Sequence, residues 1–133
     1  MDDASYEVEV SAGSLRPAAG GVVMPHRWTS EGVVVEADFT GAHLYHLAAA
    51  GCVLNDLYRE AERTGIRIDG AWVRATAGFD PATWASTGID YEVDVASDAS
   101  DEEIERLVWV VDDVAEIPKA LRSGTTVARK GLR

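Results

Sequence analysis

The chain has one cysteine, Cys52, in the stretch LAAAGCVLNDLY from Leu47 to Tyr58. A thiol attacks electrophiles such as peroxides as its thiolate, and an unperturbed cysteine has a pKa of about 8.5. Its neighbours along the chain are mostly apolar, and Asp56, one helical turn further on, disfavours a thiolate if its side chain lies close. Two interpretations are open: Cys52 is an unreactive small hydrophobe, or a reactive thiol activated by a cation from another element.

Two of the three histidines, His43 and His46, are three residues apart, a spacing that can put two ligands on one metal ion. Cys52 lies six residues beyond His46, about 240° further round an ideal helix, and does not complete that face. We therefore expect no metal site and no cofactor. The two histidines are interpreted as polar groups at a helix entrance or a subunit interface.

Composition limits the range of partners. Among 133 residues, 23 acidic side chains against 12 basic ones give a formal charge of −11, which repels phosphate backbones and anionic lipid surfaces. We expect no nucleic acid or membrane partner. The absence of a long apolar run or a basic leader predicts a single domain, residues 1–133, in a soluble cytoplasmic protein.

Two N-terminal segments alternate apolar and acidic residues, as half-buried strands do. In the first, Tyr6, Val8 and Val10 share one side. In the second, the shared side consists of Val33, Val35, Ala37 and Phe39. Between them, Val22–Met24 is a short apolar segment among Gly and Pro turn signals. The pattern predicts two or three strands of an antiparallel meander.

A long helix is predicted from Ala42 to Gly65, because this stretch is rich in Ala and Leu and lacks proline. Arg59 and Arg63 precede Gly65, as expected near a helix C-terminus. The first half, Leu44–Leu54, is apolar on nearly every side, so it must be buried on every side. In so short a chain this indicates a partner subunit.

The second half predicts two strands and a second helix. Residues 72–79 and 89–95 are rich in β-branched and aromatic side chains, and Ser100 followed by Glu103 forms a capping box. A stripe at helical spacing comprises Ile104, Leu107, Val108, Val111 and Val114. Pro118 is expected to end or bend this helix, and residues 125–129 to form a last short strand. The order β-β-(β)-α-β-β-α-β defines an α+β protein.

The order of elements and three motifs resemble the OsmC/Ohr family, the osmotically induced protein C and organic hydroperoxide resistance proteins. The motifs are LAAAGCVLNDLYREAERTGIRIDGAWVRATAGF, SDEEIERLV and LRSG, the last at Leu121 to Gly124. The resemblance covers most of the chain from Leu44 onward. It implies antiparallel sheets packed around a long central helix, in a homodimer whose two chains intertwine.

The peroxidase members of this family use one cysteine to attack the hydroperoxide and a second to resolve the sulfenic acid. Cys52 matches the first position. The second falls on Ala115 when counted from Arg106, or on Ile117 when Pro118 is matched to the family's proline. Neither position holds a cysteine, so the chain lacks the residue that would resolve the sulfenic acid in those members.

The same members hold the first cysteine as a thiolate with an arginine and a glutamate. The glutamate position falls on Ala42, and the arginine position on Arg16 or Arg27. The leading hypothesis is a one-cysteine, thiol-dependent organic hydroperoxide reductase acting through Cys52 with Arg16 or Arg27, recycled by an external thiol. The alternative is a non-catalytic dimer of this fold with a small-molecule binding or structural role.

Four tryptophans occur, Trp28, Trp72, Trp84 and Trp109. They would line an apolar pocket for a lipophilic hydroperoxide or another small apolar ligand, or else anchor the core and a subunit interface.

Overall fold

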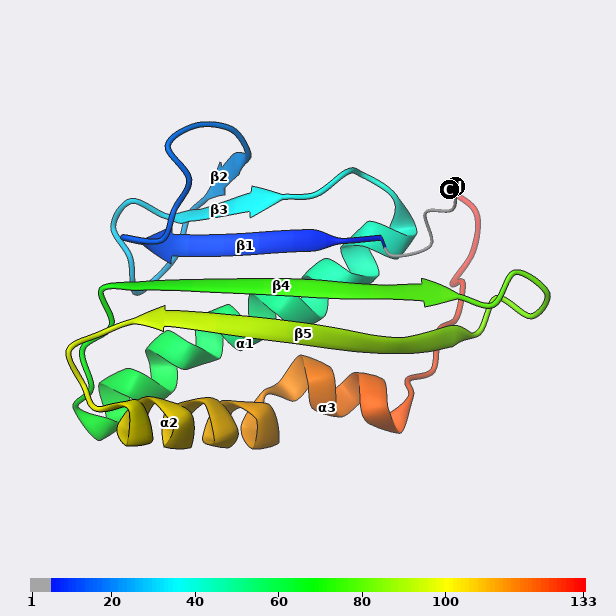
Figure 1. The fold of residues 1–133 in the computed structure, drawn as a ribbon. Coiled ribbons are helices and arrows are strands. Elements are labelled where there is room, and N and C mark those ends of the chain that lie inside the picture. Colours follow the sequence, from blue (N-terminus) through cyan, green and yellow to red (C-terminus); the bar gives the residue numbers. More distant parts are fainter. Residues whose placement is uncertain (1–5) are drawn as a thin grey trace.

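The computed structural model describes residues 6–133, so the first five residues of the predicted single domain lie outside it. A five-stranded antiparallel sheet packs on one long helix, with two shorter helices at the edge of this pair (Figure 1). The elements are β1 Val8–Gly13, β2 Val22–Met24, β3 Val33–Glu36, α1 Gly41–Thr64, β4 Gly70–Phe79, β5 Ser86–Ala96, α2 Asp101–Val114 and α3 Glu116–Ser123. The predicted α+β class is confirmed.

The sheet has the order β2-β3-β1-β4-β5. Val10 of β1 lies opposite Val35 of β3 and Val73 of β4, and Val73 lies opposite Val93 of β5, so one apolar row crosses four strands. The predicted strands and their apolar sides are confirmed in these elements. The simple meander is wrong, because β1 pairs with β3 and leaves β2 at the sheet edge.

The predicted second strand ends earlier than the alternation indicated. β3 stops at Glu36, and Phe39 is 88% exposed. The chain leaves the sheet here to reach Thr40, whose hydroxyl accepts a hydrogen bond from the His43 N–H at 3.1 Å and caps α1. The hydrogen bond that caps the N-terminus of α1 therefore determines the course of the chain here, and the strand does not continue to Phe39.

Helix α1 begins and ends where its sequence signals lie. Gly65 adopts the left-handed conformation, with φ of 75°, that terminates many helices. Val53 and Leu57 are fully buried against the sheet, whereas Leu44 is 39% exposed on another side. Within one chain, α1 is therefore covered only in part. Neither α1 nor any other helix of residues 6–133 is apolar enough over a sufficient length to cross a membrane.

Helix α2 opens with the predicted capping box. The Ser100 hydroxyl accepts from the Glu103 N–H, and the Glu103 carboxylate accepts from the Ser100 N–H, both at 3.1 Å. Ala115, with extended dihedrals, then separates α2 from α3. The helix is interrupted before Pro118, as predicted: α2 ends at Val114, whose carbonyl a proline four residues later would meet in a continuous helix. Pro118 itself lies in the first turn of α3, where its missing N–H would have no acceptor within the helix.

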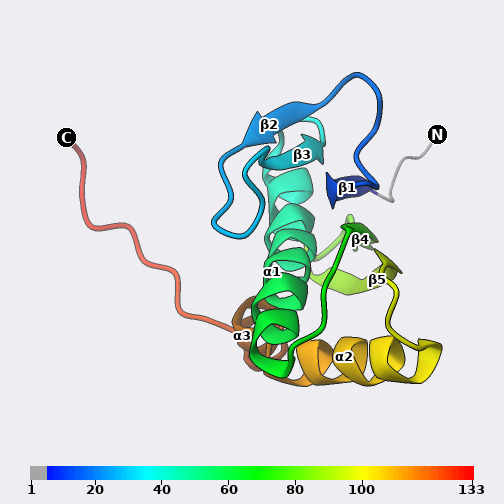
Figure 2. The same ribbon diagram turned by 90° about the vertical axis from the view of Figure 1, so that its left-hand side faces the viewer.

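The predicted last strand is also wrong. Residues 124–133 form neither helix nor strand, and the chain after Ser123 runs away from the rest of the molecule (Figure 2). Val127 is 88% exposed. The β propensity of residues 125–129 is real, but the described part of the chain pairs them with no sheet edge.

Candidate functional site

Cys52 lies in the middle of α1, is 9% exposed and forms no disulfide. It lines an apolar groove of about 510 Å³ between α1, the N-terminal strands and the start of α3. The other lining residues are mainly aliphatic: Val10, Met24, Val33, Val35, Leu44, Leu47, Ala48, Gly51, Asn55, Glu116 and Ile117. The thiol therefore lies beside an apolar surface that would accommodate a lipophilic molecule.

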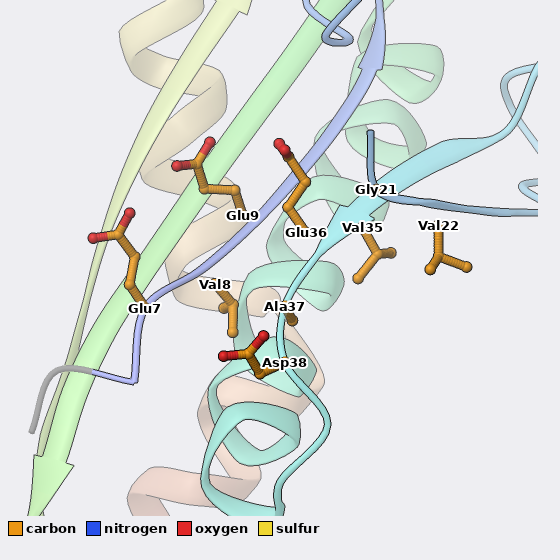
Figure 3. A pocket seen from close by; sticks show the side chains of 9 residues that line it. All are labelled: Glu7, Val8, Glu9, Gly21, Val22, Val35, Glu36, Ala37 and Asp38. Carbon is orange, nitrogen blue, oxygen red and sulfur yellow. The ribbon is translucent and has the colours of Figure 1, made fainter. Parts of the chain in front are cut away.

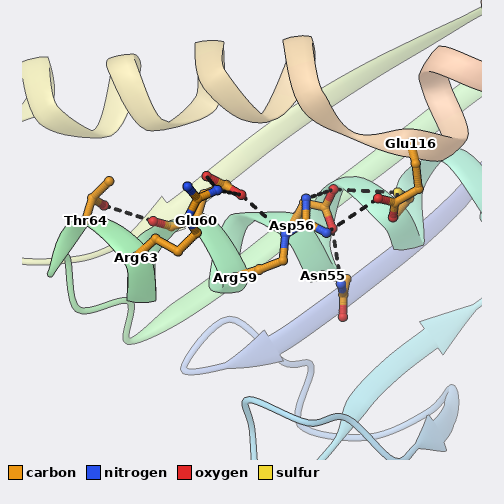
Figure 4. A network of polar contacts seen from close by, with 8 residues as sticks. Asn55, Asp56, Arg59, Glu60, Arg63, Thr64 and Glu116 are labelled. Carbon is orange, nitrogen blue, oxygen red and sulfur yellow. Dashed lines mark hydrogen bonds and ion pairs between the residues drawn. The ribbon is translucent and has the colours of Figure 1, made fainter.

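Two carboxylates face the thiol (Figure 4). The Cys52 thiol donates a hydrogen bond to Glu116, with 3.3 Å from Sγ to Oε1, and lies 3.9 Å from Oδ2 of Asp56. Asp56 follows Cys52 by one helical turn, so its position is set by α1 alone. Glu116 reaches the thiol because α3 begins at this residue and packs on α1.

These surroundings keep Cys52 protonated. Burial raises the pKa of the thiol to about 12, and the negative charges of Glu116 and Asp56 add to this effect. A hydrogen bond from the Ile117 main chain opposes the increase. At pH 7, a thiol with this pKa is protonated in nearly every molecule. The sequence-based prediction that Asp56 disfavours the thiolate is confirmed.

Arg59 joins the two carboxylates. Its Nη2 lies 2.9 Å from Oδ2 of Asp56, and its Nη1 lies 3.4 Å from Oε2 of Glu116. Asp56 is fully buried, and burial raises its pKa despite this partner. The hydrogen bond from Cys52, followed by Arg59, lowers the pKa of Glu116. Cys52 thus contacts an ionised carboxylate held by a guanidinium.

The sequence-based reasoning missed Arg59 and Glu116. Arg59 follows Cys52 by seven residues, close to two full turns, and this spacing alone would have placed it on the same helix face. No comparable signal exists for Glu116, because its approach to Cys52 depends on how α3 packs.

The two arginines predicted from the family resemblance have other partners in this chain. Arg16 donates to Glu31, with 3.1 Å from Nη2 to Oε1. Arg27 lies over the ring of Trp28, at 5.3 Å from the ring centroid. Neither arginine takes part in the hydrogen bonds and ion pairs that link Cys52, Asp56, Arg59 and Glu116.

The residues at the positions matched to the family's second cysteine and glutamate lie in three different parts of the structure. Ile117 lines the groove beside Cys52, whereas Ala115 is fully buried at the junction of α2 and α3. Ala42 lies in the first turn of α1, ten residues before Cys52. Of the two positions that the resemblance leaves open, only Ile117 borders the groove that Cys52 lines, and its side chain is aliphatic.

Cys52, Asp56 and Glu116 also form a set of metal-ligand types. One ligand atom from each lies within 4.8 Å of the others, and among the described residues no other group of three or more does so. The guanidinium of Arg59 already bonds both carboxylates and supplies the positive charge that a cation would bring.

The two histidines at the start of α1 do not join this cluster. Nδ1 of His43 is 2.6 Å from the Thr40 hydroxyl. His46 is fully buried, and its Nδ1 lies 3.3 Å from the carbonyl oxygen of Tyr6. Burial lowers the pKa of His46, so it is neutral at pH 7. His46 also stacks on Phe79 at 5.8 Å, which makes it part of an aromatic cluster.

The tryptophans do not line a common pocket. Trp84, in the connection between β4 and β5, is 72% exposed, and Trp109 on α2 is 70% exposed. Nε1 of Trp72 donates to Glu9 on the sheet face that points away from α1, whereas Trp28 packs against the core. The predicted tryptophan-lined pocket is therefore wrong, and aliphatic side chains line the groove instead.

A separate hollow of about 520 Å³ lies where β3 leaves the sheet beside β1 (Figure 3). Its rim carries four carboxylates, those of Glu7, Glu9, Glu36 and Asp38. Glu9 and Glu36 lie directly opposite each other on paired strands. Like charges in this arrangement repel each other and disfavour any anionic ligand.

A long helix with a buried thiol, packed on an open antiparallel sheet and bordered by the start of a C-terminal helix, defines an α+β protein with a cysteine-centred site. A family model described as "OsmC-like protein" matches residues 35–130. The chain belongs to this OsmC-like family, which confirms the resemblance seen in the sequence.

The structure is similar to that of an OsmC-like hydroperoxide resistance protein from Jannaschia sp. CCS1. The TM-score is 0.60 at 13% sequence identity, over 94% of this chain and 91% of that one. At this identity the likeness concerns the fold. A search of curated proteins gave no match.

Proposed function

We propose that the protein reduces organic hydroperoxides through Cys52 in a one-cysteine cycle. The observation that carries the proposal is the hydrogen bond from the Cys52 thiol to the ionised Glu116 at the side of an apolar groove. The groove would hold the organic part of the peroxide, and the carboxylate would receive the thiol proton. Membership of the OsmC-like family supports the same chemistry.

In the proposed reaction, sulfur attacks the terminal oxygen of the hydroperoxide. The thiol proton passes to Glu116 as the O–O bond breaks, and Glu116 then protonates the departing alkoxide to give the alcohol. Cys52 becomes a sulfenic acid. Because the thiolate is scarce at neutral pH, transfer to Glu116 during the attack replaces prior ionisation.

The chain holds no second cysteine, so an external thiol must complete the cycle. A first thiol condenses with the sulfenic acid, releasing water and forming a mixed disulfide. A second thiol releases Cys52 and leaves as the disulfide of the reductant. The balanced reaction converts one hydroperoxide and two thiols into one alcohol, one disulfide and one water.

Arg59 is the guanidinium that this chain brings to the site, and its role here is to keep Glu116 ionised and in place. The assignment of Arg16 or Arg27 to this role stays a prediction. In the protomer these two side chains are engaged with Glu31 and Trp28.

We also propose that the active form is a homodimer. The apolar groove borders the side of α1 on which Leu44 and Ala48 are exposed and Leu47 is half-buried. Covering this side with a second copy would bury the helix all round, as its sequence requires. It would also enclose the thiol and exclude water from the reaction.

The test is turnover of cumene hydroperoxide with dithiothreitol. The wild-type chain should consume two thiol groups for each hydroperoxide, and Cys52→Ser should remove the activity. Dimedone added with peroxide but without reductant should label Cys52. Absence of both turnover and dimedone adduct, in a chain that remains folded, would contradict the enzymatic proposal.

A second candidate is a binding protein of this family with an unreactive thiol. The thiol pKa of about 12 favours it, because ordinary peroxidatic cysteines need a thiolate. On this candidate, cumyl alcohol would bind in the groove with the same affinity in the wild type and in Cys52→Ser, and peroxide would not be consumed.

A further inference from the structure

A second cavity, distinct from the Cys52 groove, lies between α1, β5 and α3. It has a volume of about 260 Å³ and shares no lining residue with the groove. Ala49, Ile89 and Leu121 give it an apolar wall. Ligand pockets usually have about 300–1,000 Å³, so this cavity suits a small molecule and not a peptide.

Two tyrosines line the same cavity from different elements, Tyr45 from α1 and Tyr91 from β5. The ring of Tyr45 packs against Phe79, at 5.6 Å between centroids. The hydroxyl of Tyr91 donates to the carboxylate of Asp112. Both rings are therefore held in place, and fixed aromatic walls favour a flat, apolar ligand.

Arg122, in the last turn of α3, brings a guanidinium to the cavity; this side chain is 55% exposed and forms an ion pair with Asp112. Its Nη1 donates to the carbonyl oxygen of Asp112 at 3.3 Å, and its Nη2 donates to Oδ1 at 3.1 Å. These bonds fix the guanidinium and use two of its five N–H donors. Oδ1 of Asp112 accepts from both Arg122 and Tyr91, and its negative charge offsets part of the charge of the guanidinium. A fixed guanidinium with donors to spare matches a carboxylate.

We infer that this cavity binds a small aromatic monocarboxylate. The aromatic ring lies against Ile89 and Leu121 between the two tyrosines, and the carboxylate accepts hydrogen bonds from Arg122. The site does not involve Cys52, so it is independent of the proposed peroxide chemistry.

The test is calorimetric titration of the full chain with three probes at constant ionic strength. 3-Phenylpropionate should bind with a stoichiometry of one per chain. The affinity for the neutral isostere 3-phenylpropan-1-ol should be lower by a factor of about ten or more, because this alcohol lacks the charge-assisted bonds to Arg122. Octanoate should bind more weakly than 3-phenylpropionate, because it lacks the ring.

Arg122→Gln should weaken 3-phenylpropionate about tenfold and leave the alcohol unchanged. Arg129→Gln, which removes the same charge from the exposed C-terminal segment, should change neither. Leu121→Trp, which fills the cavity, should remove binding of both aromatic probes. Because Cys52→Ser should bind the probes as the wild type does, the outcome is separate from that of the peroxidase test.

Three results of these titrations would overturn the inference, and a fourth comes from a variant of the Cys52 groove. They are the absence of saturable binding to the folded wild-type chain, octanoate binding more tightly than 3-phenylpropionate, and Arg122→Gln binding the carboxylate as the wild type does. Loss of binding in Ala48→Trp, which obstructs the Cys52 groove, would equally overturn it by placing the ligand there.

Discussion

The thiol of Cys52 and the carboxylate of Glu116 form a hydrogen bond of 3.3 Å across 64 positions of the sequence. The bond stabilises the ionised carboxylate and the protonated thiol together, since it lowers the pKa of Glu116 and raises that of Cys52. A thiol and a proton acceptor are thus paired in the ground state.

Replacing Glu116 with Gln should make Cys52 easier to ionise but worse at reducing peroxide. The substitution removes a negative charge and a strong acceptor, so the thiol pKa should fall by about one unit. Alkylation by iodoacetamide, followed from pH 7 to 11, should then become faster at each pH. Peroxide turnover should decrease, because the proton acceptor is lost. An increase in both rates would contradict the proton-acceptor role.

Arg59→Gln should destabilise the fold by about 1–3 kcal/mol, because it leaves the buried Asp56 without its cation. The side chain of Arg59 is 33% exposed, so water compensates part of the loss. Urea unfolding should show a lower midpoint with an unchanged slope. Arg63→Gln is the matched control, since this side chain is 71% exposed and its loss should change stability by less than about 0.5 kcal/mol. Equal effects of the two substitutions would contradict the importance of the Asp56 contact.

The raised pKa of Cys52 should make the free energy of unfolding depend on pH in the alkaline range. The folded-state pKa of about 12 lies above the reference value of 9.0, so the native chain retains a proton that the unfolded chain loses. The contribution is complete below pH 9, and stability should fall as pH rises from 9 towards 12. The native chain keeps this proton because burial and the nearby carboxylates destabilise the thiolate form of Cys52. Cys52→Ala should reduce this slope, and the difference between the two unfolding curves isolates Cys52 from lysines and tyrosines. Parallel curves would show that the thiol pKa is not raised.

The proposed dimer should depend on the exposed side of α1. Ala48→Asp places a charge there without disturbing the face that packs on the sheet, so light scattering should show a shift from twice the 14.3 kDa chain mass to a single chain. Trp109→Asp, at a residue 70% exposed on α2, is the control and should remain dimeric. A wild-type chain that is already monomeric would refute the proposal.

The sequence predicted best those elements whose signals are local. Helix α1 was bounded by Gly65, and the start of α2 by Ser100 and Glu103, because caps act within one helical turn. Phe39 was misplaced because alternation is weaker evidence than the need of α1 for a cap at Thr40. The strand expected at residues 125–129 failed for a different reason, since a strand requires a neighbour and propensity does not supply one.

The site residues also differ in whether local spacing along the chain could predict them. Cys52 and the unfavourable Asp56 were identified because both lie on one helix, one turn apart. Arg16 and Arg27 came from a resemblance that is loose in the N-terminal region. Glu116 could not be predicted as a site residue, because its contact with Cys52 depends on tertiary packing and not on any spacing along the chain.

Ala115, the single extended residue between α2 and α3, sets the rotational phase of the second helix. Adding or removing one helical residue turns the next part of the chain by about 100°. A change of one residue at this junction would therefore carry Glu116 away from Cys52 while leaving Asp56 and Arg59 in place. The acidity of this thiol is encoded in the length of a connection as well as in residue types. Relatives with identical side chains but a longer junction would differ in their chemistry.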